Sequence, residues 1–496
     1  MPASADAGRL RVLVEMRPAL DGHGGIPQET RLIFRGLCGL PWVEVEGLLQ
    51  SSNLVASKGL PLVRGVPDPR IPPEERADRL SRVVVSLQQH QVGRLGRWGR
   101  QGGAAASWMA HAVSGRAVRL TGFEPRRFED FVWQSMFAKS LSPEDLPVVT
   151  ARPHRLVSAP WSLAHRVGVW TRGLGHGLYP TLDTRGADVL LAETPFPGRV
   201  SAGTRLVVRY HDAVPLLLPH TIKNMRHHQA AHFGALRRNA RDGAWFACVS
   251  EASRRDLLSV FPDLEARAVT IPNMVSHHFR PETRNADRVP EILWARRRRE
   301  GPLAAGPGTA LPAGGPPLRY LLMVATLEPR KNHEQLLQAW ELLRASGHGD
   351  LHLVLVGSPG WGSEALVDRL QPWLRERGGL HVLGGVPSDD LRLLYRHAAV
   401  TVCPSVAEGF NFPGVEAMRS GGVVAASDIP VHRDVFGEAS EYFNPYAAND
   451  IAACLARLLS QPAARQALQA RGAEVAGRYL PERVMPQWER FLEDGR

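Results

Sequence analysis

The chain has 496 residues, 44% of them hydrophobic and 22% charged, with a net charge of +11, a globular composition that excludes a fully disordered protein. No apolar run approaches the roughly 18 residues of a membrane-spanning helix, and Glu15 and Arg17 interrupt the first twenty residues, so we expect neither a membrane anchor nor a cleaved signal peptide. The four scattered cysteines form no CxxC pair, which argues against a zinc site or a disulfide framework and favours the reducing cytoplasm.

The first half has the pattern of a doubly wound α/β domain. It opens with a predicted strand at 9–15, a glycine-rich turn at 21–25 and a helix at 27–37. Later strands are expected at 187–193, 205–210, 244–250 and 268–272, with a polar helix at 224–241. Between these two parts, residues from about 50 to 180 hold many Gly, Pro and Trp residues and no sharp motif. We therefore expect a Rossmann-like domain over 1–283 with an insertion at about 50–180.

A linker is predicted at 284–318, because residues 301–317 are rich in Gly, Pro and Ala, which break helices and cannot form a core. The densest basic run, Arg296 to Arg299, falls here and is expected to be flexible rather than to bind nucleic acid. The positive charge of the whole chain favours anionic partners such as nucleotides or phospholipid head groups. A solvated arginine-rich surface is an equal alternative.

The second half alternates more regularly. Strands are predicted at 320–325, 351–356, 380–383, 400–403 and 423–426. One helix is predicted between each pair of successive strands, at 334–343, 363–377, 388–396 and 413–419. Strands separated by helices imply a parallel sheet, so residues 319–478 are expected to form a second Rossmann-like domain, followed by a C-terminal helix over 479–496 that crosses back to the first. Open parallel sheets bind ligands beyond the carboxyl ends of their strands, and two facing sheets would place a site in the cleft between them.

The most informative segment is EGFNFPGVEAMRSGG, residues 408–422, which directly follows a strand. Pro413 suits the start of a helix, so the loop from Gly409 to Phe412 would present backbone amides and a helix N-terminus that attract a phosphate. An ordinary strand-to-helix turn with a glycine is the alternative, and the spacing of Glu408 and Glu416 is weak evidence alone.

Four further turns lie at expected carboxyl ends of strands. Arg330 and Lys331 suit a diphosphate, one by its fork geometry and the other as a point charge, or are solvated turn residues. His211 can hydrogen-bond a sugar hydroxyl or be structural. Ser250 is a good helix N-cap, which can be its whole role. Gly25 lets a backbone amide approach a phosphate or simply makes a tight turn.

Taken together, five segments resemble family 4 retaining glycosyltransferases, and within them bacterial mannosyltransferases of surface-polysaccharide assembly. The segments are EGFNFPGVEAMRSGG, ATLEPRKNH, YHDAVPLLLPH, VSEASRRDL with IPNMV, and SDIPVHRDVFGEASEYFNP. The resemblance covers about 10–37 and 187–475, and the stretch from about 50 to 180 has no counterpart. It implies the GT-B fold, an α/β architecture of two Rossmann-like domains that face each other across a cleft.

The resemblance also implies roles for individual residues. Glu408 would face the donor sugar and Glu416 the nucleotide ribose. Arg330 and Lys331, helped by amides of the loop, would hold the diphosphate. The remaining implied residues are the loop members Gly409, Phe410, Asn411 and Phe412, Val386 in the turn beside the base, Gly25 near the phosphates, and His211 with Asp212 near the transferred sugar. Many relatives carry an arginine where this chain has Thr326 in the donor site, so binding of the diphosphate would depend more on Arg330 and Lys331.

The expected function is transfer of a hexose, mannose in particular, from a nucleotide sugar to a glycan or lipid-linked glycan. GDP-mannose is favoured over a UDP-sugar as the donor substrate, and no cofactor and no metal are expected. A cytoplasmic enzyme with peripheral contact to an anionic membrane and no nucleic-acid partner fits these features. The alternative is a catalytically inactive GT-B-like protein that binds membrane or nucleic acid, while a dinucleotide oxidoreductase is disfavoured because no GxGxxG follows the first strand.

Overall fold

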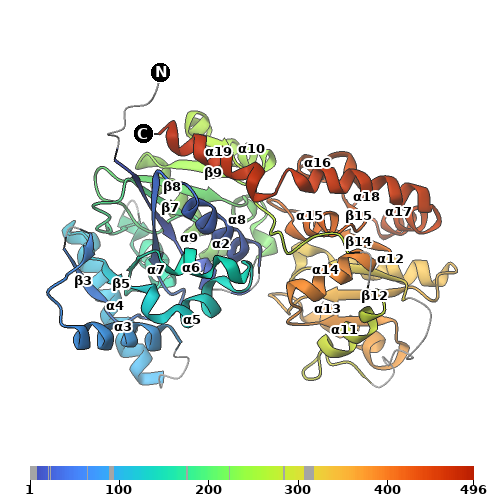
Figure 1. Cartoon of the computed structure of the whole chain (residues 1–496). Helices are drawn as coiled ribbons and strands as arrows, with labels where there is room; N and C mark the ends of the chain where they lie inside the picture. Colours follow the sequence, from blue (N-terminus) through green and yellow to red (C-terminus); the bar gives the residue numbers. More distant parts are fainter. Residues whose placement is uncertain are drawn as a thin grey trace.

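The protein consists of two α/β lobes that lie side by side (Figure 1). The computed structural model describes residues 8–20, 22, 24–63, 65–88, 94–174, 177–222, 224–282, 285–306 and 318–495, without the side chains of 94–98 and 174. Residues 21 and 23 of the predicted glycine turn, and 284 and 307–317 of the predicted linker, lie outside the described residues.

The first lobe is built on a sheet with the strand order β10-β9-β8-β7-β1-β2-β6-β5-β3-β4. In chain order the strands are β1 (Leu10–Glu15), β2 (Val43–Leu49), β3 (Leu60–Val63), β4 (Val66–Pro67), β5 (Thr121–Phe123), β6 (His154–Leu156), β7 (Val189–Ala192), β8 (Arg205–Tyr210), β9 (Trp245–Cys248) and β10 (Ala268–Thr270). From β10 to β6 all neighbours are parallel, and Val12 of β1 pairs with Val45 of β2 and Val189 of β7. Beyond β6 the pairs are antiparallel.

Helices cover this sheet on both faces because the central strands are apolar on both sides. They are α1 (Arg17–Leu20), α2 (Gly25–Cys38), α3 (Pro73–Gln88), α4 (Arg94–Ser114), α5 (Glu129–Val132), α6 (Leu146–Thr150), α7 (Trp161–Trp170), α8 (Val214–Leu217), α9 (Met225–Arg241) and α10 (Glu251–Val260). The predicted helices at 27–37 and 224–241 correspond to α2 and α9.

The stretch from about 50 to 180 is part of the first lobe and not a separate module. Its strands β6, β5, β3 and β4 extend the sheet beyond β2. Phe123, Val132 and Phe137 are fully buried in the same core as Val12 and Val14 of β1. This stretch therefore enlarges the sheet at the edge that lies away from the second lobe (Figure 1).

The second lobe holds a parallel sheet of order β13-β12-β11-β14-β15-β16. Its strands are β11 (Tyr320–Val324), β12 (His352–Val356), β13 (Leu380–Leu383), β14 (Val400–Cys403), β15 (Val424–Ser427) and β16 (Ser440–Phe443). Its helices are α12 (His333–Ala345), α13 (Glu364–Pro372), α14 (Ser388–His397), α15 (Phe412–Arg419), α16 (Pro430–Phe436), α17 (Ala448–Ser460) and α18 (Pro462–Gly477). The predicted alternation is thus present, with β16 and α16 in addition.

The expectation of a linker over 284–318 is wrong for residues 285–306. Helix α11 (Arg288–Arg296) buries Val289, Ile292 and Leu293 in the core of the second lobe. The basic run that begins at its last residue is held in place as well, because Arg296 pairs with Asp390 at 2.9 Å and Arg298 donates to Gly357 O at 2.7 Å. The apolar side of this short helix outweighs the glycine and proline content that follows it.

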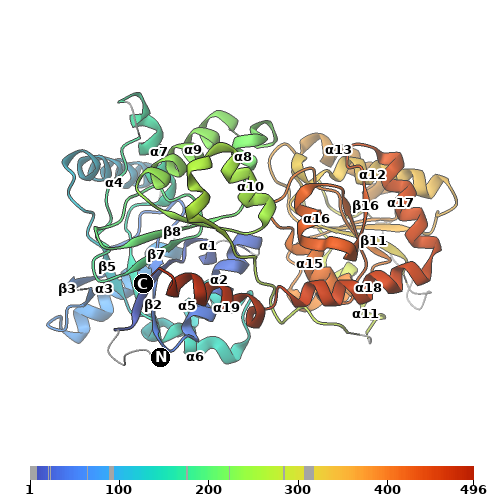
Figure 2. The ribbon, with the colours of Figure 1, turned by 90° about the horizontal axis from the view of Figure 1, so that it is seen from above.

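The last helix, α19 (Pro481–Glu493), returns from the second lobe to the first (Figures 1 and 2). It packs against α2, and Trp488, Phe491 and Leu492 are buried in the core that contains Val12. Trp488 has no exposed surface. The first lobe is therefore completed by the end of the chain.

Candidate active site

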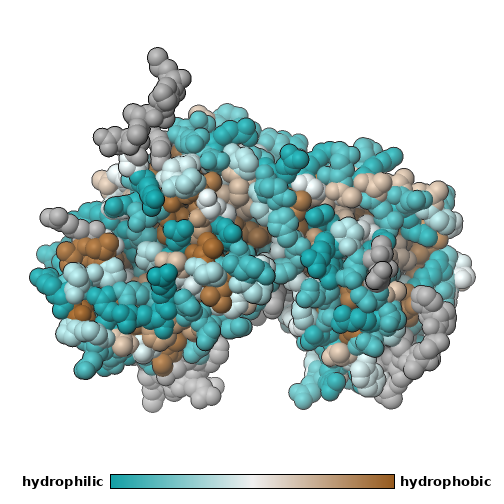
Figure 3. All heavy atoms as spheres, in the orientation of Figure 1, coloured by the Kyte–Doolittle hydropathy of each residue, from teal (hydrophilic) through white to brown (hydrophobic). Residues whose placement is uncertain are grey.

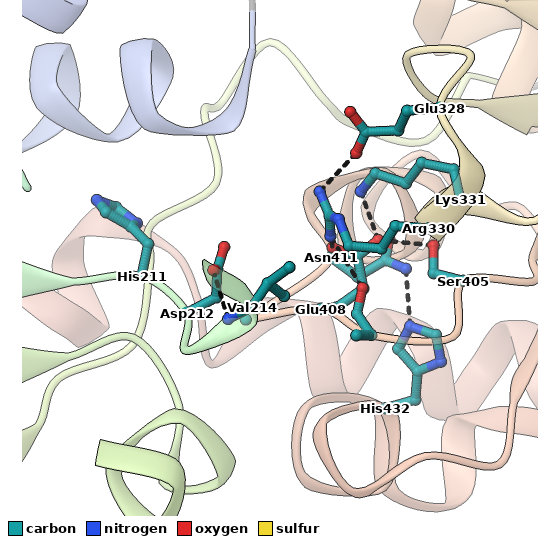
Figure 4. A network of polar contacts seen from close by, with 12 residues as sticks. His211, Asp212, Val214, Glu328, Arg330, Lys331, Ser405, Glu408, Asn411 and His432 are labelled. Atoms are coloured by element: carbon teal, nitrogen blue, oxygen red, sulfur yellow. Dashed lines mark hydrogen bonds and ion pairs between the residues drawn. The ribbon is translucent and has the colours of Figure 1, made fainter. Parts of the chain in front are cut away.

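The candidate active site lies where the carboxyl ends of strands from the two lobes meet. The 3₁₀ turn η8 (Pro329–Lys331) follows β11, and the loop from Pro404 to Asn411 follows β14. From the first lobe, His211 and Asp212 follow β8. Figure 4 shows Arg330, Lys331 and Glu408 gathered in the second lobe, with His211 and Asp212 on the first-lobe side of the junction. The topology of parallel sheets thus assembles groups that are distant in the sequence.

Two cations of η8 converge on one carboxylate. Lys331 Nζ donates to Glu408 Oε1 at 2.5 Å, and Arg330 Nη1 donates to Glu408 Oε2 at 2.9 Å. Ser405 Oγ also donates to Glu408 Oε1, at 2.7 Å. Arg330 reaches Glu328 Oε1 at 2.8 Å through its other terminal nitrogen (Figure 4). The site is therefore a preorganised cluster in which the position of each charge is fixed by at least one partner.

Burial and charge compete in setting the protonation of this cluster. Burial raises the pKa of Glu408, but the nearby Lys331 and Arg330 outweigh it and hold that pKa well below the usual range. Burial lowers the pKa of Arg330, while Glu408, Asp212 and Glu328 raise it above the ordinary value. Burial raises the pKa of Glu328 despite its two cationic neighbours. Glu408 is thus a carboxylate, and Arg330 a guanidinium, at any physiological pH.

The loop after Glu408 leads directly into α15. Asn411 has φ 76° and is the N-cap, with its Oδ1 accepting from Gly414 N at 3.2 Å. Its Nδ2 donates to His432 Nε2 at 2.8 Å, and His432 Nδ1 donates in turn to Ser427 O at 2.9 Å. The side chain of Asn411 is therefore fixed at both ends, which holds the N-terminus of α15 in a defined direction.

Glycines allow the lobes to touch at this loop. A Cβ atom on Gly409 would lie 1.8 Å from His211 O, and one on Gly25 would lie 2.5 Å from the Phe412 ring. Phe412 packs against Phe410, with ring centroids 5.2 Å apart. The predicted residues Gly25, Gly409, Phe410 and Phe412 therefore meet at the junction of the lobes, where any larger side chain would separate them.

His211 and Asp212 lie on the first-lobe side of the cluster (Figure 4). Asp212 Oδ1 accepts from Val214 N at 3.0 Å, and its charge is among those that raise the pKa of Arg330. Burial, together with the cations Arg209 and Arg17, lowers the pKa of His211 to about 3. His211 is thus a neutral imidazole that can form a hydrogen bond but carries no charge at neutral pH.

A second charged network lies beneath His211 in the first lobe. Arg209 and Glu29 are paired at 2.9 Å with no exposed surface on either side chain. Arg17 pairs with Glu15 at 2.7 Å and lies 4.1 Å above the ring of Trp161. Glu193 is fully buried, and burial raises its pKa well above the usual range. This network is internal, whereas the cluster around Glu408 borders the space between the lobes.

Glu416 lies on the first turns of α15 and is buried. It accepts from Tyr395 Oη at 3.0 Å. Burial raises the pKa of Glu416 to about 7, although the Tyr395 hydroxyl and the Gln28 side chain of the first lobe lower it. The two glutamates of the segment 408–422 are therefore in different environments, since the pKa of Glu408 is lowered and that of Glu416 is raised.

Thr326 and Val386 lie in turns at the same edge of the second sheet but outside the ion-pair cluster. Thr326 follows β11, is exposed and has its methyl group beside Gly360. Val386 follows β13, is half-buried and packs against the second-lobe core. Both stay candidates for contacts with a ligand that extends away from Glu408.

Four members of the site were missed in the sequence. Glu328 and Ser405 are close in sequence to predicted residues, and a search for polar neighbours at strand ends would have found them. His432 and Tyr395 come from other elements, and only the folded structure brings them to Asn411 and Glu416. In the described part of the chain, no group of three His, Cys, Asp or Glu side chains has the arrangement of a metal site.

Comparison with known proteins finds a family match over the second lobe. Residues 316–475 match the family of glycosyl transferases group 1. The chain is 35% identical over 168 residues to O-antigen chain mannosyltransferase B of Escherichia coli, across 34% of this chain and 44% of that protein. It is 31% identical over 147 residues to MMP alpha-(1->4)-mannosyltransferase of Mycolicibacterium hassiacum, across 29% and 35%. The matched part thus spans less than half the length of these curated relatives.

Solved structures match the whole chain in fold. Sucrose-phosphate synthase of Thermosynechococcus elongatus has a TM-score of 0.60 at 14% identity and covers 98% of this chain and 99% of its own. Anabaena HepE in complex with UDP-glucose has a TM-score of 0.56 at 13% identity, with coverage of 98% and 100%. The predicted GT-B fold of two facing Rossmann-like domains is therefore confirmed, and Figure 3 shows the surface hollowed between the lobes.

Proposed function

We propose that this chain is a retaining glycosyltransferase that acts on a nucleotide sugar, because its second lobe matches the family of glycosyl transferases group 1. The observation that carries the proposal is the convergence of Arg330 and Lys331 on Glu408, opposite His211 and Asp212. Two fixed cations beside a helix N-terminus suit a diphosphate. Glu408 and the neutral His211 can hydrogen-bond the hydroxyl groups of the sugar between the lobes.

The proposed reaction exchanges one bond at the anomeric carbon. The bond from that carbon to the diphosphate oxygen breaks, and a bond to the acceptor oxygen forms on the same face of the sugar. The proton of the acceptor hydroxyl passes to the departing phosphate oxygen. Arg330 and Lys331 stabilise the negative charge that develops on the diphosphate, the part of the transition state that requires the most electrostatic stabilisation.

The donor that we favour is GDP-mannose, because the curated relatives are mannosyltransferases by name. The glycan or lipid-linked glycan acceptor would enter from the first lobe, beside His211. The positive charge in the donor cluster is supplied by side chains, so the proposal needs no metal and no cofactor. The matching relatives named for O-antigen chains favour a role in surface-polysaccharide synthesis.

Peripheral contact with an anionic membrane from the cytoplasmic side is a further part of the proposal, motivated by the net charge of +11. Of the tryptophans in the stretch from about 50 to 180, Trp108 is buried whereas Trp170 is 61% exposed. No helix in the described ranges is both long and apolar enough to cross a bilayer. Sedimentation with anionic vesicles at low salt tests this contact, and failure to sediment contradicts it.

The decisive experiment is a thermal-shift screen with GDP, UDP and ADP, followed by transfer assays with GDP- and UDP-sugars. We expect GDP to stabilise the protein most and GDP-mannose to be turned over, with retention of the anomeric configuration by NMR. Glu408→Gln should bind nucleotide but lose most turnover. Salt-sensitive DNA binding without any nucleotide binding would instead support an inactive binding protein.

A further inference from the structure

Two serine hydroxyls of the first lobe meet at one carbonyl of the donor loop, that of Gly409. Ser250 Oγ donates to Gly409 O at 2.7 Å, and Ser253 Oγ lies 3.2 Å from the same oxygen. Both serines belong to the start of α10 in the first lobe and are only 3% and 2% exposed. Ser250 is the helix N-cap as expected, accepting from Ser253 N at 3.0 Å. Its hydroxyl proton can go to Gly409 O at 2.7 Å or to Ser253 Oγ at 3.1 Å, and the shorter distance is to the other lobe.

Ser253 connects this carbonyl to the first-lobe side of the site. Its Oγ is 3.0 Å from His211 O as well as 3.2 Å from Gly409 O, and its one proton can go to either oxygen. Ser253 therefore keeps a partner in its own lobe when the lobes separate, which lowers the cost of breaking and remaking the contact. It also sets the spacing between His211 and the loop after Glu408.

The carbonyl that the serines hold belongs to the same peptide unit as the backbone N–H of Phe410. A trans peptide is planar, so its C=O and N–H point in opposite directions. Fixing Gly409 O toward α10 aims the Phe410 N–H away from α10. A hydrogen bond accepted by the carbonyl also polarises the peptide and strengthens its N–H as a donor. The serines thus control one of the amides proposed to bind the diphosphate.

A second contact supports the first. Asp434 of α16 in the second lobe accepts from Glu251 N at 2.8 Å and from Ala252 N at 3.2 Å, both at the N-terminus of α10. Figure 2 shows α10 and α16 facing each other where the lobes meet. A carboxylate at a helix N-terminus is favourable in charge and in geometry, so the second lobe supplies an additional cap to a helix of the first.

We propose that Ser250 and Ser253 are positioning residues that orient the Phe410 amide toward the diphosphate and lock the donor loop against His211. The proposal rests on the proposed function for the identity of the ligand. Asp434 of α16 holds the N-terminus of the same helix, α10, to the second lobe. The site is then complete only when the two lobes are in contact. When the lobes are apart, the donor is not positioned for reaction.

The test compares the affinity of wild type and Ser253→Ala for GDP and for GMP. Loss of one orienting hydrogen bond should weaken GDP binding by roughly tenfold and GMP binding by less than about twofold, because only the diphosphate reaches the Phe410 amide. Ser253→Thr keeps the hydroxyl and should retain most of the GDP affinity. Ser259→Ala, on the exposed end of α10, is the matched control. Equal weakening of GDP and GMP, or no change, overturns the proposal.

A second measurement separates this proposal from the proposed function. The distance between fluorescent labels on the two lobes is recorded for wild type, Asp434→Asn and the double variant S250A/S253A. We expect a longer mean distance in both variants, and no change in Asp450→Asn, whose carboxylate accepts from Asn444 N within one lobe. If the wild type binds no nucleotide, the proposed function is wrong. If the distance is unchanged in the variants, the proposed role of the serines in holding the lobes together is wrong, whether or not nucleotide binds.

Discussion

The two lobes each hold a network of arginine and glutamate side chains, and the networks differ in what surrounds them. In the first lobe, Arg209 and Glu29 have no exposed surface. In the second, Arg330 and Lys331 keep 15% and 17% of their side chains exposed while they share Glu408. The same residue types therefore serve the stability of the lobe in one place and can meet a ligand in the other. Accessibility, not residue type, distinguishes the two.

The largest expected effect is on stability, from breaking the internal pair. Glu29→Ala leaves Arg209 buried and uncompensated, which should lower the free energy of unfolding by about 3–5 kcal/mol. Urea-induced unfolding of the purified protein measures it. Glu44→Ala removes the exposed partner of Arg11 and serves as the control, with an expected loss below about 1 kcal/mol. Equal losses in the two variants would contradict the distinction between the networks.

Removing a cation from the second network should affect catalysis in place of stability. Lys331→Ala is expected to lower kcat by roughly 10²–10³-fold, because charge on the leaving diphosphate loses a fixed partner. The thermal midpoint should stay close to that of wild type. Lys58→Ala replaces an exposed lysine and should leave kcat unchanged. Unchanged turnover in Lys331→Ala would remove this lysine from the site.

The pH dependence of stability gives a third test, at Glu416. Its pKa is raised from 4.5 to about 7 in the folded protein. Between these values the folded state holds a proton that the unfolded chain releases, so the free energy of unfolding falls as pH rises, by up to roughly 3 kcal/mol. Glu416→Gln cannot ionise, so relative to wild type it should gain stability across this window. Parallel curves for the two proteins would contradict the prediction.

A smaller effect is expected at His211. His211→Ala should lower kcat/KM by about tenfold, the value of one hydrogen bond to a sugar hydroxyl. Because burial and neighbouring cations lower its pKa to about 3, the wild-type profile of kcat/KM should show no ionisation of this imidazole between about pH 5 and 8. A break in the wild-type profile that is lost in His211→Ala would show that the imidazole is charged in this range.

The smallest effect is expected for an ion pair that is neither buried nor at the site. Asp428 and Arg433 are paired at 2.7 Å with side chains that are 51% and 50% exposed. Asp428→Asn should change the free energy of unfolding by less than about 1 kcal/mol, because solvent screens exposed charges. Urea-induced unfolding of Asp428→Asn and Glu29→Ala under the same conditions compares an exposed ion pair with a buried one. A loss as large as that of Glu29→Ala would show that exposure does not set the contribution.

The elements of the second lobe were predictable because they depend on local pattern. Apolar strands alternate with helices of ordinary length, and Gly421, with φ 80°, lies just after the end of α15, where the chain leaves the helix. Glu408, Arg330 and Lys331 were predictable for a related reason, since parallel sheets bring the residues that follow their strands to one edge. Their mutual ion pairs follow from that placement.

Other features depend on contacts that no local pattern encodes. The pairing of β6 with β2 joins residues that are far apart in the sequence. Helix α11 was missed because three apolar residues in a basic, proline-flanked segment give a weak signal until a core is available to receive them. The contact of Ser253 with Gly409 was missed because a serine at a helix start already has a local explanation as part of a cap.

The return of α19 to the first lobe has a consequence for synthesis on the ribosome. Trp488 is enclosed in a core formed mainly by the opening segments of the chain, and Met485 lies against Gly36 of α2. The first lobe is translated early, but its core is closed only after α19 has been made. Until α19 is made, the apolar first-lobe surface that Trp488 and Phe491 cover is therefore left unpacked, whereas the second lobe has a core made of residues that precede α19.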